Sequence, residues 1–259
     1  MSEMHDLKAK VKKYYRFTPA ELRGLVISIL IIGFIVSFRE WGPGNEVMLS
    51  VGLFNWFNSS LLAALTLLAF ISAQKIVSLQ AGLNAEYRMS MWALSFGLLV
   101  AFVSRGYIWF LIPGGIIFHH MAGHRLGWYR YDVNYFALAI LSLWGPIANI
   151  VLAIIFKIIN GFIFHPMFQK AIALNLVFAV YSILPIPPAA GNKVYFGSRM
   201  LYAFSLVLVV AAAVFLWIDI PIWIAIGGAL AVAVVGWLLY YTIWEKDMWQ
   251  SPYAKMREK

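Results

Sequence analysis

The sequence predicts an all-α, polytopic membrane protein with about six transmembrane helices and one re-entrant hairpin. Hydrophobic residues make up 63% of the 259 residues and charged residues 12%, against roughly 45–50% and 25% in soluble domains. The chain also contains six apolar runs that approach the roughly 20 residues needed to cross a bilayer. These observations exclude an ordinary soluble enzyme, a disordered tail and a fibrous repeat.

The apolar runs define a single membrane domain over residues 24–243, which follows a basic amphipathic segment at 1–23. A cytoplasmic tail at 244–259 completes the chain. The basic segment is expected to lie on anionic lipid. The expected spans are 24–38, 59–77, 134–158, 168–188, 200–218 and 220–243.

A further apolar region, residues 91–118, is interrupted by Ser104-Arg105-Gly106 and by Pro113-Gly114-Gly115. One continuous helix is incompatible with these breaks, so a re-entrant pair is expected. Its broken backbone then needs protein or water as a hydrogen-bond partner.

The positive charges indicate how the spans are oriented. If region 91–118 returns to the side it left, all Lys and Arg residues except Arg39, Arg105, Lys157 and Lys170 lie on one side. The positive-inside rule places that side, with both termini, in the cytoplasm of a cell-membrane protein. The net charge of +9 is therefore topogenic, and nucleic acid is not an expected partner. Membrane lipids are expected partners, because Trp is enriched at membrane–water interfaces and the chain has 11 Trp residues.

None of the 11 acidic residues lies in the middle of an expected span, and the chain has no Cys. A small transporter is permitted by the span count. However, ion coupling usually requires a carboxylate inside the membrane, so transport remains an alternative interpretation.

Two proline motifs interrupt the apolar spans. Gly145-Pro146, followed by Asn149, predicts a kinked, closely packed helix in which Asn149 bonds the freed backbone groups. The stretch 182–191, with Pro185, Pro187 and Pro188, predicts unwinding at membrane depth. On this reasoning Asn149→Leu should weaken folding or partner binding.

The segment His119-His120-Met121-Ala122-Gly123-His124 offers a possible metal site. A helix would place His120 and His124 on one face, as in the zinc motif H-E-x-x-H. Met121 replaces the glutamate that would activate water, and the glycine-rich surroundings favour a connector. Zinc held by His120 and His124 therefore remains an alternative.

The two proline motifs resemble those of the site-2 protease family of intramembrane zinc metalloproteases, most closely a compact archaeal-type branch. The late motif of that family reads N-x-x-P-x-P-P-L-D-G, and the similarity covers about residues 59–199. Further matches, in the order that the family has them, are Gln74-Lys75, Gly82, Ala85-Glu86-Tyr87-Arg88 and Ile112-Pro113-Gly114-Gly115.

The resemblance implies that the active site is lost. The positions of the two zinc-binding histidines and the aspartate carry Phe70, Gln74 and Ala190, and Ile71 stands where the catalytic glutamate would be. Phe, Ile and Ala offer zinc no lone pair, and Gln is a poor ligand. No cofactor is therefore expected. The motif's asparagine position carries Ser182.

These substitutions indicate a pseudoprotease that binds another integral membrane protein, or its transmembrane segment, as a scaffold or accessory subunit. The structural residues expected to be retained from the family's cleft are Gly145, Pro146, Asn149, Ser182, Pro185, Pro187, Pro188 and Gly191. Gln74 and Ser182 are expected to hydrogen-bond the guest, and Asn175 and Tyr181 lie on the same span as Ser182. An active metalloprotease with a relocated His120–His124 site and a transporter are the alternatives.

Overall fold

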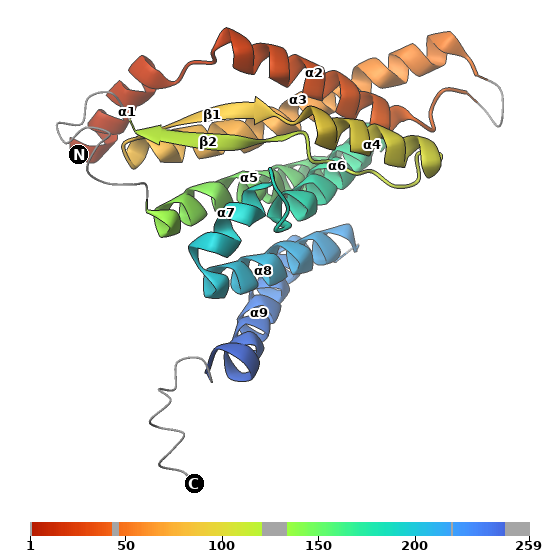
Figure 1. Ribbon diagram of the computed structural model, residues 1–259. Helices are drawn as coiled ribbons and strands as arrows, with labels where there is room; N and C mark the ends of the chain where they lie inside the picture. Colours follow the sequence, from red (N-terminus) through yellow and green to blue (C-terminus); the bar gives the residue numbers. More distant parts are fainter. Residues whose placement is uncertain (1, 43–46, 121–133, 219, 247–259) are drawn as a thin grey trace, which may run out of the picture.

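The computed structural model describes residues 2–42, 47–120, 134–218 and 220–246, shown in Figure 1. It is mostly helical, with one pair of strands. In chain order the elements are α1 (Ser2–Tyr14), α2 (Pro19–Ser37), α3 (Leu49–Gln80), β1 (Leu83–Met89), α4 (Met91–Val103), β2 (Gly114–His120), α5 (Tyr135–Phe162), α6 (Pro166–Ile183), α7 (Ala190–Gly197), α8 (Arg199–Trp217), α9 (Ile222–Tyr240) and the π-helical turn η1 (Tyr241–Glu245).

Six helices are long and apolar enough to cross a membrane, which confirms the multi-pass character predicted from the sequence. They are α2, α3, α5, α6, α8 and α9 with η1. Their bounds differ from the expected spans, most clearly in α2, α3 and α6. Helix α3 has 32 residues and so extends for about 48 Å. Helix α6 ends at Ile183, because the prolines that follow cannot continue a hydrogen-bonded helix.

The expectation of an all-α fold is wrong, because β1 and β2 form an antiparallel pair. In β1, Leu83, Ala85 and Tyr87 are buried, while the residues between them are more exposed. This alternation is the pattern of a half-buried strand. A search for apolar runs of about 20 residues does not detect this strand pair, because each strand has only seven residues.

Region 91–118 runs out and back, but only its first arm is helical. Helix α4 has 13 residues, about 20 Å, which is too short to span a bilayer. The chain then returns without regular structure to β2. At its base, the Ser90 N–H donates to the carbonyl of Pro113 at 2.8 Å, so both ends of the excursion lie together.

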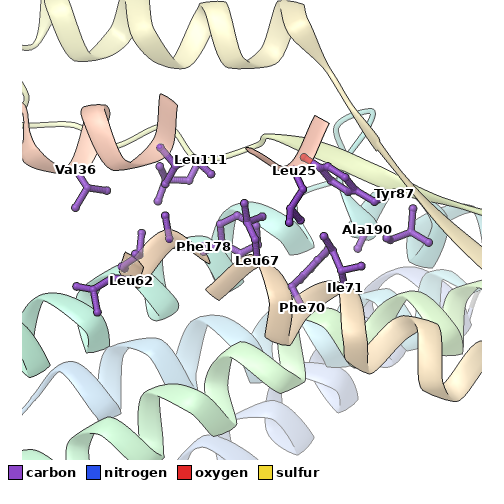
Figure 2. Close-up of a cluster of buried hydrophobic side chains, with 14 of the residues drawn as sticks. Leu25, Val36, Leu62, Leu67, Phe70, Ile71, Tyr87, Leu111, Phe178 and Ala190 are labelled. Atoms are coloured by element: carbon purple, nitrogen blue, oxygen red, sulfur yellow. The ribbon is translucent and has the colours of Figure 1, made fainter. Parts of the chain in front are cut away.

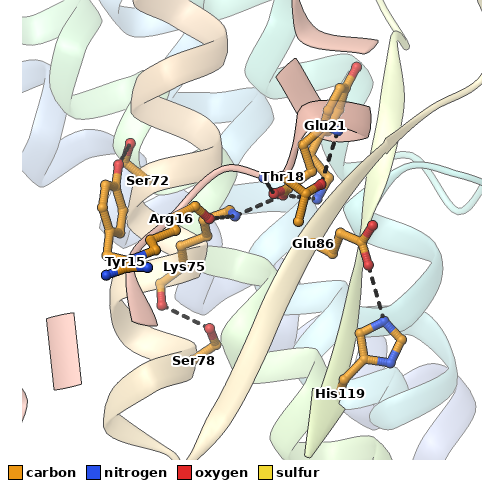
Figure 3. A network of polar contacts seen from close by, with 10 residues as sticks. Tyr15, Arg16, Thr18, Glu21, Ser72, Lys75, Ser78, Glu86 and His119 are labelled. Carbon is orange, nitrogen blue, oxygen red and sulfur yellow. Dashed lines mark hydrogen bonds and ion pairs between the residues drawn. The ribbon is translucent and has the colours of Figure 1, made fainter. Parts of the chain in front are cut away.

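A buried polar network fixes β1 against α2 and α3 (Figure 3). The Glu21 carboxylate lies 2.7 Å from Lys75 Nζ and accepts hydrogen bonds from the backbone N–H of Thr18 and of Tyr87. Lys75 also donates to the carbonyl of Arg16 at 3.0 Å. Because α2 begins at Pro19 instead of residue 24, Glu21 belongs to its first turn and is buried. The chain therefore has a buried carboxylate at the end of a membrane helix.

Candidate functional site

The residues at the family's zinc and base positions come together in one hydrophobic core. Phe70 and Ile71 lie on α3, and Ala190 begins α7. All three belong to the same buried cluster, with exposed fractions of 5%, 0% and 5%. Figure 2 shows these side chains among their apolar neighbours. The same cluster also holds buried residues of α2, β1, β2, α5 and α6, so it is the main core of the protein.

This region is closed by direct packing. The Phe70 ring meets Phe178 of α6 edge to face, with the ring centroids 5.3 Å apart. On the α5 side, a Cβ built on Gly145 would overlap the Phe70 ring and Nε2 of Gln74. Gly145 thus permits the close approach of α5 to α3 that the motif predicts.

The residues of this cluster do not fit a zinc ion. Phe70, Ile71 and Ala190 fill the space with hydrocarbon, and the side chain of Gln74 is 1% exposed. Zinc in proteins is held by imidazole, thiolate or carboxylate groups, and none of these four side chains supplies one. The cluster serves packing, and no hydrolytic step can be assigned to it.

The prediction that Asn149 bonds freed backbone groups is wrong. Pro146 lies within α5, which continues through it to Phe162. Asn149 is fully buried, and neither its Oδ1 nor its Nδ2 has a hydrogen-bond partner among the described protein atoms. The side chain is directed into the packed interior, where no free backbone group meets it.

The late motif forms a tight turn between α6 and α7. Pro185, Pro187 and Pro188 lie in this turn, and α7 then starts at Ala190. A Cβ on Gly191 would overlap the carbonyl of Ile183 at the end of α6. A glycine is therefore needed where α7 folds back on α6.

Two residues expected to contact a guest segment are instead buried. Ser182 is 5% exposed and donates its hydroxyl to the carbonyl of Ala179 in its own helix. Gln74 is packed beside Gly145. Of their helix neighbours, Asn175 is buried and its Nδ2 donates to the carbonyl of Ala171, while Tyr181 packs on Phe110. None of these four side chains is fully exposed at the surface.

The structure does not support the helical arrangement of the histidines. His120 is the last residue of β2, and His124 lies outside the described residues. His119 Nε2 is 3.6 Å from a Glu86 carboxylate oxygen, across the strand pair. Within the described ranges, no three His, Asp or Glu side chains come close enough to hold a metal.

An open groove of about 590 Å³ lies beside this cluster, between the strand pair and the turn that leads into α7. The approach is close, since a Cβ on Gly115 would overlap the carbonyl of Pro188. Ala189 lines the groove, immediately before Ala190 of the cluster. The lining residues are Arg88, Met89, Ser90, Met91, Trp92, Gly115, Ile116, Ile117, Pro188, Ala189, Asn192 and Lys193.

The groove combines a strand with cationic side chains. The sheet has two strands, and on its side away from β1 strand β2 makes no backbone hydrogen bond to any described residue. Arg88 is exposed, and burial lowers the pKa of the Lys193 amine below its ordinary value. The Lys193 Nζ lies 6.0 Å from the centroid of the Phe118 ring on β2.

A larger hollow of about 680 Å³ lies between the 107–109 loop, α6 and α8. Its lining is apolar and aromatic, and three of its residues, Trp109, Val177 and Tyr181, pack against the same buried cluster. Unlike the groove beside β2, it is lined by no charged side chain and by no residue of either strand. The groove beside β2 is therefore the candidate binding site.

Sequence reasoning missed the strand edge, the grouping of Arg88 with Lys193, and the Glu21–Lys75 pair. Two signals were available. Apolar and polar residues alternate along 83–89, as in a strand, and Thr18 and Glu21 have the spacing of a helix capping box, which the structure contains. That Arg88 and Lys193 line one groove depends on the path of the turn after α6, which the sequence does not predict.

Comparisons with known proteins add no relative: no family model, no curated protein and no solved structure matches this chain. The resemblance to site-2 proteases therefore depends on the sequence motifs alone.

Proposed function

We propose that this protein is a catalytically inactive, site-2-protease-like membrane protein that binds a segment of another integral membrane protein. It would act as a scaffold or accessory subunit. Its binding site is the groove between β2 and the turn that precedes α7.

One observation carries the proposal: the four substituted positions are packed shut while the groove beside them stays open. Phe70, Ile71 and Ala190 share a buried core, and Ala189 lines the open groove. Loss of catalysis with retention of a binding surface is what a pseudoprotease requires. A working protease would need ligands in place of this hydrocarbon.

The unpaired edge of β2 supports an extended polypeptide as the guest. An unpaired strand edge presents backbone N–H and C=O groups that another strand can bond. Near the membrane such groups are costly to leave without partners. The positive-inside rule assigns Arg88 and Lys193 to the cytoplasmic side, so the guest segment would emerge there.

Photocrosslinking from a single position tests whether the groove is occupied. Benzoylphenylalanine would replace Trp92, which lines the groove and is 62% exposed. The matched control carries it at Trp223 of α9, which is 74% exposed. We expect a discrete membrane-protein adduct from position 92 that is absent from position 223. Equal adduct patterns from both positions would refute the assignment of the groove.

Metal analysis separates the proposal from the active-protease alternative. Full-length protein purified gently from its own membrane should contain far less than one zinc per chain. About one zinc per chain, lost in His124→Ala, would favour the active-protease alternative with zinc at His120 and His124. A solute flux in liposomes would favour the transporter alternative.

A further inference from the structure

We infer that the groove beside β2 selects acidic segments, so that the guest is an extended stretch of polypeptide rich in Asp or Glu. This inference rests on the proposed function and specifies the chemistry of the partner. It follows from the charges that line the groove and from the edge of the strand beside it.

The lining of the groove carries positive charge without a compensating carboxylate. Arg88 and Lys193 are its two charged members, and none of the described lining residues is acidic. Neither cation forms an ion pair within 4.0 Å among the described residues. Each is therefore available to a carboxylate brought by a guest.

The acid of the strand pair, Glu86, lies outside the lining of the groove. Glu86 lies two residues before Arg88 on the same face of β1, since side chains two apart share a face. Its carboxylate faces His119 on the neighbouring strand, and it does not line the groove. Among the described lining residues, the charge presented to a molecule in the groove is thus that of Arg88 and Lys193.

The strand edge decides in favour of a polypeptide over a lipid headgroup. A phosphate could meet Arg88 and Lys193, but it offers β2 no alternating donors and acceptors. An extended peptide supplies both sets of groups at the spacing of a strand. Ile117 of β2, which is half-buried, adds apolar surface against which the peptide's side chains would pack.

Three labelled peptides of one β-forming sequence, with Glu, Gln or Lys at alternate positions, test the inference. Each is titrated against the full-length protein in phosphatidylcholine nanodiscs, with binding followed by fluorescence anisotropy. We expect the Glu peptide to bind about tenfold more tightly than the Gln peptide and the Lys peptide to bind most weakly. A Glu peptide with a fully N-methylated backbone should lose most of its affinity, because it lacks strand donors.

The variant Arg88→Gln/Lys193→Gln should reduce the preference for Glu over Gln to less than about threefold. The matched control is Lys8→Gln/Lys12→Gln on α1, where both side chains are exposed and the net charge falls equally. This control should retain the preference. Circular dichroism on both variants verifies that each is folded.

The outcomes separate this inference from the proposed function. If all three peptides bind equally and the N-methylated peptide does not, the groove binds strands without selecting acids, and only the inference fails. If no peptide binds, the proposed function fails as well. If phosphatidylserine in the nanodiscs abolishes the preference for Glu, the two cations serve lipid headgroups, and the inference is overturned.

Discussion

The buried ion pair between Glu21 and Lys75 allows a quantitative test of how the strand pair is anchored. The side chains are 1% and 4% exposed, and their charged atoms are 2.7 Å apart. Removing one partner from such a pair typically costs about 3–5 kcal/mol, because the other charge remains buried and uncompensated. Glu21→Gln should therefore lower the free energy of unfolding by about 3–5 kcal/mol, two to four powers of ten in the equilibrium constant.

The cost should be smaller when both charges are removed. In Lys75→Met the Glu21 carboxylate still accepts the N–H groups of Thr18 and Tyr87, so part of its stabilisation remains. In Glu21→Gln/Lys75→Met no buried charge is left. The double variant should thus be less destabilised than the sum of the two single variants, with a coupling free energy of about 1–3 kcal/mol.

Equilibrium unfolding in mixed micelles with increasing dodecyl sulfate, followed by tryptophan fluorescence, measures these free energies. Asp6→Asn is the matched control, since it removes a carboxylate from the exposed pair with Lys10, also 2.8 Å apart. We expect that change to cost less than about 0.5 kcal/mol. Equal effects of Glu21→Gln and Asp6→Asn, or fully additive single variants, would refute this reasoning.

Three further predictions concern the site. Gly145→Ala should destabilise the fold by about 1–3 kcal/mol through overlap with Phe70, and adding Phe70→Leu should recover part of this loss. In the same unfolding assay the control Gly161→Ala should cost nothing, because a Cβ there meets nothing within 4 Å. Asn149→Leu should leave stability unchanged or raise it by about 1–3 kcal/mol, because the buried amide lacks a protein partner; marked destabilisation would show that the amide is bonded in the membrane. Burial lowers the pKa of Lys193 below its ordinary 10.5. Between that lowered value and pH 10.5 the unfolded chain binds more protons than the folded chain, so the free energy of unfolding should rise with pH. Over the same pH range the affinity for the Glu peptide should fall, and a rise in affinity would exclude Lys193 as a contact.

The sequence was sufficient to predict six long apolar helices, because runs of about twenty apolar residues are typical of helices that cross a membrane. The alignment of Phe70, Ile71 and Ala190 with a family site came from resemblance, and the structure shows only that all three belong to one large buried core. The sequence could not predict that Asn149 lacks a partner, since this depends on how α5 rotates against its neighbours. Nor could it supply the groove, because the depth of a surface hollow is set by side chains far apart in the chain.

The hydrogen bond between Ser90 and Pro113 brings the two ends of the 90–113 segment together, so a much shorter connection could join the two strands. Strands β1 and β2 are paired from Leu83 with His120 to Met89 with Gly114, so they amount to one hairpin whose loop is the entire 90–113 excursion. Register in a hairpin is held by the strands themselves and by the turn that joins them. A two-residue Asn-Gly connection in its place could keep the strand register, but it would also remove Ala101 and Leu111 from the main buried core. Such a miniaturised chain would separate what the sheet contributes from what the inserted loop contributes.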